Sequence, residues 1–475
     1  MTQTAGALPP APVPPAVIEW LQGLLRERFH NDLLLTQADN GSWRLSLPES
    51  ETCVRLRCDF DIFQSDPRQL PCGHWLPQEE THWLPEGCVG LPTPGAAHSP
   101  QRMVEHDDDG YLLHYDLLSL AYWMLSRREE AGRKDLDPHG RFPAEASHAF
   151  RHGYLERPIV DEWLEVLRKA MLAAWPRLAM HPQQYSIRLS HDVDTPARYG
   201  LMGGGRLIRN MLVDMLREHS RDRRALMKAP WIWSASAQRL DPRDPFNTFE
   251  WIMDRSEEAG LHNAFYFICG RTDAKRDGDY PPGHPAIIEL MRRIHARGHE
   301  IGLHPSYNTY LDPTALAAEA ENLRRYCEQA GVQQSEFGVR MHYLRWQTPD
   351  TPRAQVAARL VYDTTLGYAK HPGFRCGTCH EFQAFDPLKG EAMPLRLRPL
   401  IVMESTIIQG LRAKDSGAAE ARMMRLMQAC RRVRGCFTLL WHNTMLEHPH
   451  QRRMYERVLS HHRELAVPPT QRVPS

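Results

Sequence analysis

Short apolar segments and helical segments alternate along residues 183–460, and this alternation constrains the fold more than any other feature of the chain. Strands are expected at Tyr185–Ser190, Ala264–Cys269, Glu300–Leu303, Phe337–Arg340 and Phe437–Trp441. The segment Ala264–Cys269 is apolar throughout, which is typical of a strand buried on both faces of a parallel sheet. Alternating strands and helices therefore predict an α/β fold, here a parallel barrel whose functional site lies at the carboxyl ends of its strands.

The first 180 residues differ in pattern from the rest of the chain. Residues 1–16 are rich in proline and lack both the basic start and the apolar core of a signal peptide, so they predict a flexible leader. Residues 17–180 combine an amphipathic helix, alternating strand segments, and strong helices at Tyr115–Glu130 and Val160–Trp175. They predict a smaller α+β domain ahead of the barrel, which occupies residues 181–475. Its role stays open between a scaffold, a surface that positions a glycan and a partner interface.

Charge and composition exclude several classes of partner. The chain carries 58 basic and 58 acidic side chains, and a zero net charge argues against binding to nucleic acid or to an anionic membrane. No apolar stretch approaches the roughly 18–20 residues that cross a bilayer, so we expect no membrane span and a cytoplasmic location. Ten cysteines are too few for a disulfide scaffold, and the pair Cys376 and Cys379 lacks a second pair to complete a zinc site. The oligomeric state stays undetermined.

Polar side chains close three of the predicted strands. Asp192 and Asp194 end the first strand, His304 ends the third and His442 ends the last. Two carboxylates one residue apart need a cation or an arginine to separate their charges, although Asp194 also suits a simple Asx turn. The carboxyl ends of parallel strands meet at one edge of the sheet, so these side chains can share one cation. Aspartate and histidine ligands suit zinc, with cobalt, manganese or nickel as alternatives.

The same residues resemble the motifs of the polysaccharide deacetylase (NodB-like) family, carbohydrate esterase family 4. The matching segments are Ser190–Asp194, Gly298–His304 and Leu440–His442, with a looser match at Arg340–Tyr343. The resemblance covers roughly residues 183–460 and implies a distorted (β/α)7-type barrel. The segments Leu125–Glu130, Gly140–Pro143 and Arg157–Val160 resemble the N-terminal extension of bacterial multi-domain members, which implies no activity for that region.

The resemblance also implies a role for each motif residue. Asp192 would be the general base, Asp194 and His304 metal ligands, Arg340 the group that holds the base, and His442 the general acid. The implied substrate-facing positions are the Tyr343 amide, which would help to bind the oxyanion, and Leu440 and Trp441 of the last motif.

The third metal ligand is the point at which this chain departs from the family's pattern. The histidine expected four residues after His304 is Asn308. An amide oxygen is a poor ligand for zinc but acceptable to harder metals, whereas His342, two residues past Arg340, could reach the site from the next strand. Water could also fill the position, or the site could have lost its metal. We expect a retained metal, with His342 or Asn308 as the third ligand.

Together these residues predict a metal-dependent deacetylase that hydrolyses N- or O-acetyl groups of a carbohydrate, with an acetylated glycan as its partner. Two alternatives stay open: a catalytically inactive glycan-binding or assembly protein on the same barrel, which Asn308 favours, and an amidase for a non-sugar amide. A long loop over residues 362–386 carries Arg375, which could contact a sugar, although a packing role is equally compatible with its sequence.

Overall fold

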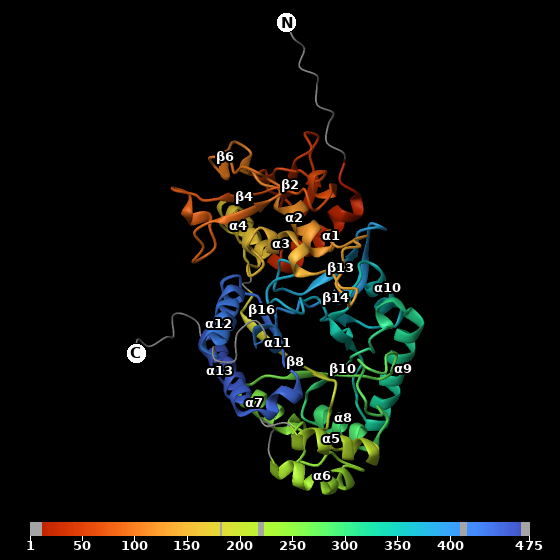
Figure 1. Cartoon of the computed structure of the whole chain (residues 1–475). Helices are drawn as coiled ribbons and strands as arrows, with labels where there is room; N and C mark the ends of the chain where they lie inside the picture. The colour runs from red at the N-terminus through yellow and green to blue at the C-terminus, as the bar shows by residue number, and fades with distance from the viewer. Residues whose placement is uncertain (1–11, 181–182, 217–222, 409–415, 467–475) are drawn as a thin grey trace, which may run out of the picture.

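A nine-stranded sheet dominates the computed structural model, which describes residues 12–180, 183–216, 223–408 and 416–466 (Figure 1). Its strands are β8 (Ser186–Val193), β9 (Asn263–Phe267), β10 (Glu300–Leu303), β11 (Gly338–Val339), β12 (Tyr362–Asp363), β13 (Phe382–Asp386), β14 (Glu391–Leu397), β15 (Val402–Met403) and β16 (Cys436–Leu440). Their order across the sheet is β13-β14-β12-β11-β10-β9-β8-β16-β15. Every neighbouring pair from β14 to β15 is parallel, and β13 runs antiparallel to β14.

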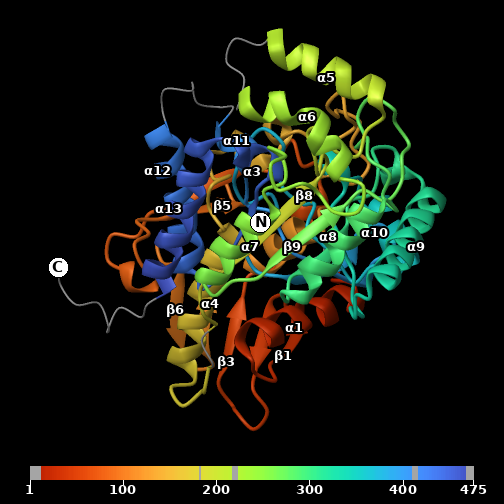
Figure 2. The ribbon, with the colours of Figure 1, turned by 90° about the horizontal axis from the view of Figure 1, so that it is seen from below.

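Helices lie around this sheet, as the view from below shows for α7 to α10, α12 and α13 around β8 and β9 (Figure 2). The helices of this part are α5 (Gly204–Leu216), α6 (Arg223–Ala235), α7 (Phe249–Glu258), α8 (Pro285–Ala296), α9 (Pro313–Ala330), α10 (Asp350–Ala357), α11 (Glu404–Ile408), α12 (Ser416–Arg432) and α13 (Pro449–Ala466). Helix α8 begins at Pro285 because proline loses no helical hydrogen bond in the first turn. The residues that it buries against the strands include Ile287, Leu290, Met291 and Ile294, the stripe that their spacing predicts.

The parallel sheet that the sequence predicts is confirmed, whereas its closure into a barrel stays a prediction. Among the described residues, no strand pairing joins the edge strands β13 and β15. The sheet is nevertheless curved. This curvature follows from one cavity of about 540 Å³, which is lined from four of its strands by Ser190, Tyr266, Tyr362 and Thr438.

The N-terminal part has a smaller sheet of its own. Its strands β1 (Leu34–Gln37), β2 (Trp43–Ser46), β3 (Cys53–Leu56), β7 (Gly110–Leu113) and β6 (Val104–Asp107) pair in that order, and β4 (Cys72–Trp75) pairs with β5 (Leu91–Pro94). Its helices are α1 (Pro15–Phe29), α2 (Leu117–Leu125), α3 (His148–Arg151) and α4 (Ile159–Ala174). The predicted leader falls mostly on residues 1–11, which lie outside the described residues. None of the helices in the described ranges combines the length and the apolar character that a bilayer span requires.

The two parts of the chain share one hydrophobic core at the β13–β14 hairpin, which lies between them in Figure 1. Phe382, Phe385 and Leu395 of the hairpin belong to the same buried cluster as the helices of the N-terminal part, and the Trp20 indole donates to the Gln383 carbonyl at 3.0 Å. The N-terminal part is therefore packed firmly against the larger sheet.

A buried ionic contact joins the two parts as well. Arg375 donates to both carboxylate oxygens of Glu130, at 2.9 and 2.7 Å, and Arg127 donates to the same carboxylate at 2.7 Å. All three side chains are almost fully buried. Of the two roles that the sequence left open for Arg375, contact with a sugar or packing, the structure shows packing of the 362–386 loop against the N-terminal part, because Glu130 offers the guanidinium a fixed opposite charge.

Candidate active site

A cavity of about 390 Å³ lies at the carboxyl ends of the central parallel strands. It is lined by Asp192 and Asp194 at the end of β8, His304 after β10, His342 after β11 and His442 after β16. These strands lie close together in the sheet order, so residues separated by up to 250 positions share one small volume. The side chains that the sequence placed on separate strand ends therefore converge.

Asp194, His304 and His342 present ligand atoms to one another within 4.8 Å. Asp194 Oδ1 lies 3.2 Å from His304 Nε2 and 3.6 Å from His342 Nε2. The other nitrogen of each ring faces an acceptor: His304 Nδ1 lies 2.6 Å from the Arg340 carbonyl, and His342 Nδ1 lies 3.1 Å from Asp277 Oδ1. Those acceptors keep the proton on Nδ1 and leave a lone pair on each Nε2, which is how proteins orient histidine ligands of metals.

A positive charge is required at the point where these nitrogen lone pairs face the Asp194 carboxylate. Asp194 Oδ1 is buried and has no hydrogen-bond partner in the described residues, and Asp192 Oδ1 is in the same condition. Burial works against the charge of Asp194, but the close approach of His304 and the charges of His342, His304 and His442 hold its pKa well below its usual range. Burial likewise opposes a charged His304, yet Asp192 and Asp194 outweigh it and raise its pKa. The donor set of one carboxylate and two imidazoles therefore fits a divalent first-row metal ion.

Asn308 lies outside this cluster. Its side chain is exposed, its Nδ2 donates to the Thr272 carbonyl at 3.1 Å, and its Oδ1 accepts from Arg345 Nη1 at 3.3 Å. The turn after His304 directs residue 308 away from the ligands. Of the two side chains that the sequence left open as third ligand, the structure brings His342 to the cluster.

Asp192 is buried beside a rigidly held arginine. Its Oδ1 lies 3.8 Å from Arg340 Nη1, and its Oδ2 lies 3.7 Å from His304 Nε2. Arg340 is itself almost fully buried, and it donates to Thr364 Oγ1 at 2.9 Å and to Ser190 Oγ at 2.8 Å. Because these bonds fix the guanidinium, it can hold Asp192 in one orientation.

His442 faces Asp194 from the opposite side and has a buried acidic partner that the sequence reasoning missed. Its Nε2 lies 3.7 Å from Asp194 Oδ2, and its Nδ1 lies 2.6 Å from Glu404 Oε1. Burial lowers the pKa of His442, but Glu404, Asp194 and Asp192 outweigh it and raise the pKa to about 10. A signal for Glu404 exists in the sequence, since it directly follows the short apolar segment Ile401–Met403, which forms the strand next to β16.

Tyr343, Leu440 and Trp441 differ in their relation to the cavity. Tyr343 is 38% exposed, lines the cavity and packs edge-on against His342 with ring centroids 4.8 Å apart. Leu440 is buried beneath the cavity wall, in a cluster with Leu344 and partly buried Met403, both of which line the cavity. Trp441 points into the core between sheet and helices, so it supports the strand and does not face the cavity.

The N-terminal part supplies one wall of the same cavity, which the sequence did not indicate. His139 and Arg141 line it, as do Arg276 and Lys370 from the larger part. Arg141 Nη1 donates to the Tyr343 carbonyl at 2.6 Å, and the Arg345 guanidinium donates to the His139 carbonyl at 2.7 Å. The rim is therefore basic and assembled from both parts of the chain.

Comparison with known proteins gives partial likenesses. Residues 34–176 match a family model described as a family of unknown function, DUF7033, and no curated protein matches the chain. A solved structure described as a polysaccharide deacetylase from Mycobacterium smegmatis is 16% identical, with a TM-score of 0.35 over 63% of this chain and 96% of that one. Puue allantoinase is 10% identical, with a TM-score of 0.34 over 59% of this chain and 85% of that one. A structure described as a polysaccharide deacetylase from Pseudomonas aeruginosa PAO1 is 13% identical, with a TM-score of 0.33 over 60% of this chain and 90% of that one. These TM-scores are low, so the function is inferred from the side chains.

Proposed function

We propose that this chain is a metal-dependent hydrolase that removes N- or O-acetyl groups from a carbohydrate. The observation that carries the proposal is the facing set of Asp194, His304 and His342, with Asp192 on one side and His442 on the other. Asp194, His304 and His342 would hold the ion, with zinc first and cobalt, manganese or nickel as alternatives. A bound divalent ion supplies Lewis acidity, which polarises an acyl carbonyl and lowers the pKa of water.

The residues around the ion supply a base and an acid. Asp192, held by Arg340, accepts a proton from water as the water oxygen bonds to the acyl carbon. His442 then donates its Nε2 proton to the leaving nitrogen or oxygen as the acyl bond breaks, so that one water is consumed and acetate and an amine or alcohol are released. Glu404 accepts a hydrogen bond from His442 Nδ1, and this bond keeps the Nε2 proton directed at the cavity. The Tyr343 amide is the proposed donor to the oxyanion.

The cavity wall suits an acylated sugar. Leu344, Ala369 and Met403 form an apolar strip over Leu440, where an acetyl methyl group can lie. The half-exposed Tyr343 ring offers a flat surface on which a sugar face can stack. The inactive-barrel alternative is disfavoured, because a site that bound no metal would have no need of two imidazole nitrogens directed at one carboxylate oxygen, Asp194 Oδ1.

Acetate release tests this function directly. The full chain, loaded with zinc, cobalt, manganese or nickel in turn, is offered N- and O-acetylated oligosaccharides and acetylated non-sugar amides. We expect release from a glycan, and a loss of about 10²–10⁴-fold in rate in Asp192→Asn with metal content unchanged. The exposed residue Asp312 provides the matched control, Asp312→Asn, which should keep the full rate. Full activity of Asp192→Asn would refute the mechanism, and release from non-sugar amides alone would refute the substrate class.

A further inference from the structure

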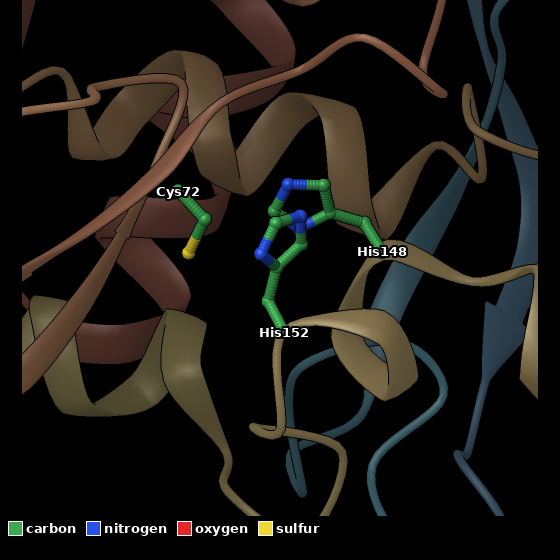
Figure 3. A group of neighbouring side chains, drawn as sticks. All are labelled: Cys72, His148 and His152. Atoms are coloured by element: carbon green, nitrogen blue, oxygen red, sulfur yellow. The ribbon is translucent and has the colours of Figure 1, made fainter.

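A second group of metal-ligating side chains lies in the N-terminal part, where the proposed function uses none of them (Figure 3). Cys72 is the first residue of β4, His148 is the first residue of α3, and His152 directly follows that helix. Their ligand atoms all lie within 4.8 Å of one another. A thiol and two imidazoles are the donors that zinc and similar borderline-soft ions prefer.

The two histidines are arranged as helical metal ligands are. They are four residues apart on one helical turn, a spacing that places both rings on the same side, and the ring centroids are 4.2 Å apart. Burial lowers the pKa of His148 to about 3, and burial together with the charge of Arg151 lowers the pKa of His152. Both rings are therefore neutral at ordinary pH, which is the form that binds metals.

The hydrogen bonds of His148 fix which nitrogen is available. Its Nε2 lies 3.1 Å from the Leu70 carbonyl, which can only accept, so Nε2 carries the proton. Its Nδ1 then holds a lone pair, to which the Tyr154 hydroxyl donates at 2.5 Å. A carbonyl behind one ring nitrogen is the usual support of a histidine ligand, and a cation at Nδ1 has only to replace the Tyr154 proton.

Cys72 completes the group from a different element. Its half-buried thiol contacts the neighbouring Gly73 carbonyl at 3.6 Å, and no hydrogen bond that the described residues show joins it to His148 or His152. Burial raises the pKa of this thiol to about 11, so the thiolate requires a nearby positive charge. In Figure 3 the sulfur lies on the side of His152 where the ring nitrogens are, and both residues are partly open to solvent, which leaves an entry path for an ion.

A third cluster, Asp161 with Cys379 and His380, provides an instructive contrast. There Arg28 donates to Asp161 Oδ1 at 2.7 Å, and the Thr378 hydroxyl and Cys379 amide bond the same carboxylate. The cationic position is filled by the protein itself. In the described part of the chain no arginine or lysine is hydrogen-bonded to Cys72, His148 or His152; Arg151 acts on the two rings only through its charge.

We propose that Cys72, His148 and His152 bind one zinc or similar divalent ion, with a fourth position open to water. The ion would join β4 to the turn that begins with α3. That turn leads to Leu155, whose carbonyl accepts from the Phe374 amide at 2.8 Å in the loop of the larger part. The site is thus placed to stiffen the contact between the two parts, and it does not depend on the proposed hydrolase activity.

Cobalt distinguishes this site from the one in the larger sheet. The cluster around Asp194 contains no sulfur, so a cobalt–thiolate charge-transfer band separates the two sites, and its loss in Cys72→Ser assigns the thiolate to Cys72. In the full chain loaded with Co²⁺ we expect the band in the unmodified protein and in His304→Ala, and its loss in Cys72→Ser and in His152→Ala. Cys88→Ser, which removes another half-buried free thiol of the same region, should keep it. Bound zinc should fall by one ion per chain in Cys72→Ser.

Results other than these would contradict the proposed site at Cys72, His148 and His152. A band that survives Cys72→Ser, or its absence from the unmodified protein at saturating Co²⁺, would overturn the assignment. Loss of the band in Cys88→Ser but not in Cys72→Ser would assign the thiolate elsewhere. His152 is partly exposed, so His152→Ala decides the question if Cys72→Ser fails to fold.

Discussion

The identity of the third metal ligand gives the sharpest test of the proposed site, because sequence position and structure favour different residues. His342→Ala removes a nearly buried imidazole whose Nε2 lies 3.6 Å from Asp194 Oδ1. Asn308→Ala removes an exposed amide that bonds Thr272 and Arg345. The two variants should therefore differ in metal affinity.

The size of the difference follows from the role of each side chain. Loss of a residue that only supports a ligand costs about 10–100-fold in metal affinity, and this is the loss expected for Asp277→Asn behind His342. His342→Ala removes the ligand itself, so its loss in metal affinity should be at least the upper end of that range, about 100-fold or ~2.7 kcal/mol. Asn308→Ala should stay within about 3-fold, because it contributes no ligand atom.

The assay is competition for zinc between a coloured chelator and the full chain carrying Cys72→Ser, which removes the second proposed site, at fixed pH, with thermal unfolding in chelator as a check on folding. The expected order of affinity is this parent chain and Asn308→Ala together, then Asp277→Asn, then His342→Ala. If Asn308→Ala lost as much affinity as His342→Ala, or if His342→Ala stayed within about 3-fold of the parent chain, the ligand set would be wrong.

Three further results are expected. Glu404→Gln removes the charge 2.6 Å from His442 Nδ1 and should lower kcat for acetate release by about 10²-fold or more with metal content unchanged. Glu130→Ala removes the nearest counter-charge of two buried guanidiniums, one of them Arg375, and should lower the free energy of unfolding by about 3–5 kcal/mol in denaturant titrations. Burial raises the pKa of Asp116 to about 6, so the folded state holds that proton more tightly than the unfolded state. The contribution of Asp116 to stability should fall as pH rises from about 4 to about 6, by no more than about 3 kcal/mol, and Asp116→Asn should abolish this part of the pH dependence.

Matched variants on the surface provide the controls. Glu391→Gln, an exposed change on β14, should keep full activity. Glu420→Ala breaks a surface pair with Arg457 and should cost less than about 1 kcal/mol. Asp39→Asn, the same change at an exposed aspartate, provides the control for Asp116→Asn. An unchanged kcat in Glu404→Gln, a loss in Glu130→Ala no larger than in Glu420→Ala, or the same pH dependence with and without the Asp116 carboxyl would each contradict the corresponding argument.

The sequence by itself determined the parallel sheet and the convergence of its strand-end residues. Apolar segments that alternate with helices are typical of parallel strands, and parallel strands present their carboxyl ends at one edge. Asp192, Asp194, His304 and His442 each follow such a segment directly, so local position was enough to bring them together.

Only the tertiary structure decided how the site is completed. His342 rather than Asn308 joins the ligands because the chain turns after His304, and Glu404 reaches His442 because β15 pairs with β16. Arg375 meets Glu130 across more than 240 positions of sequence, in the core shared by the two parts. Such contacts depend on how separate elements pack, and a local pattern of residues does not identify the side chain that lies across an interface.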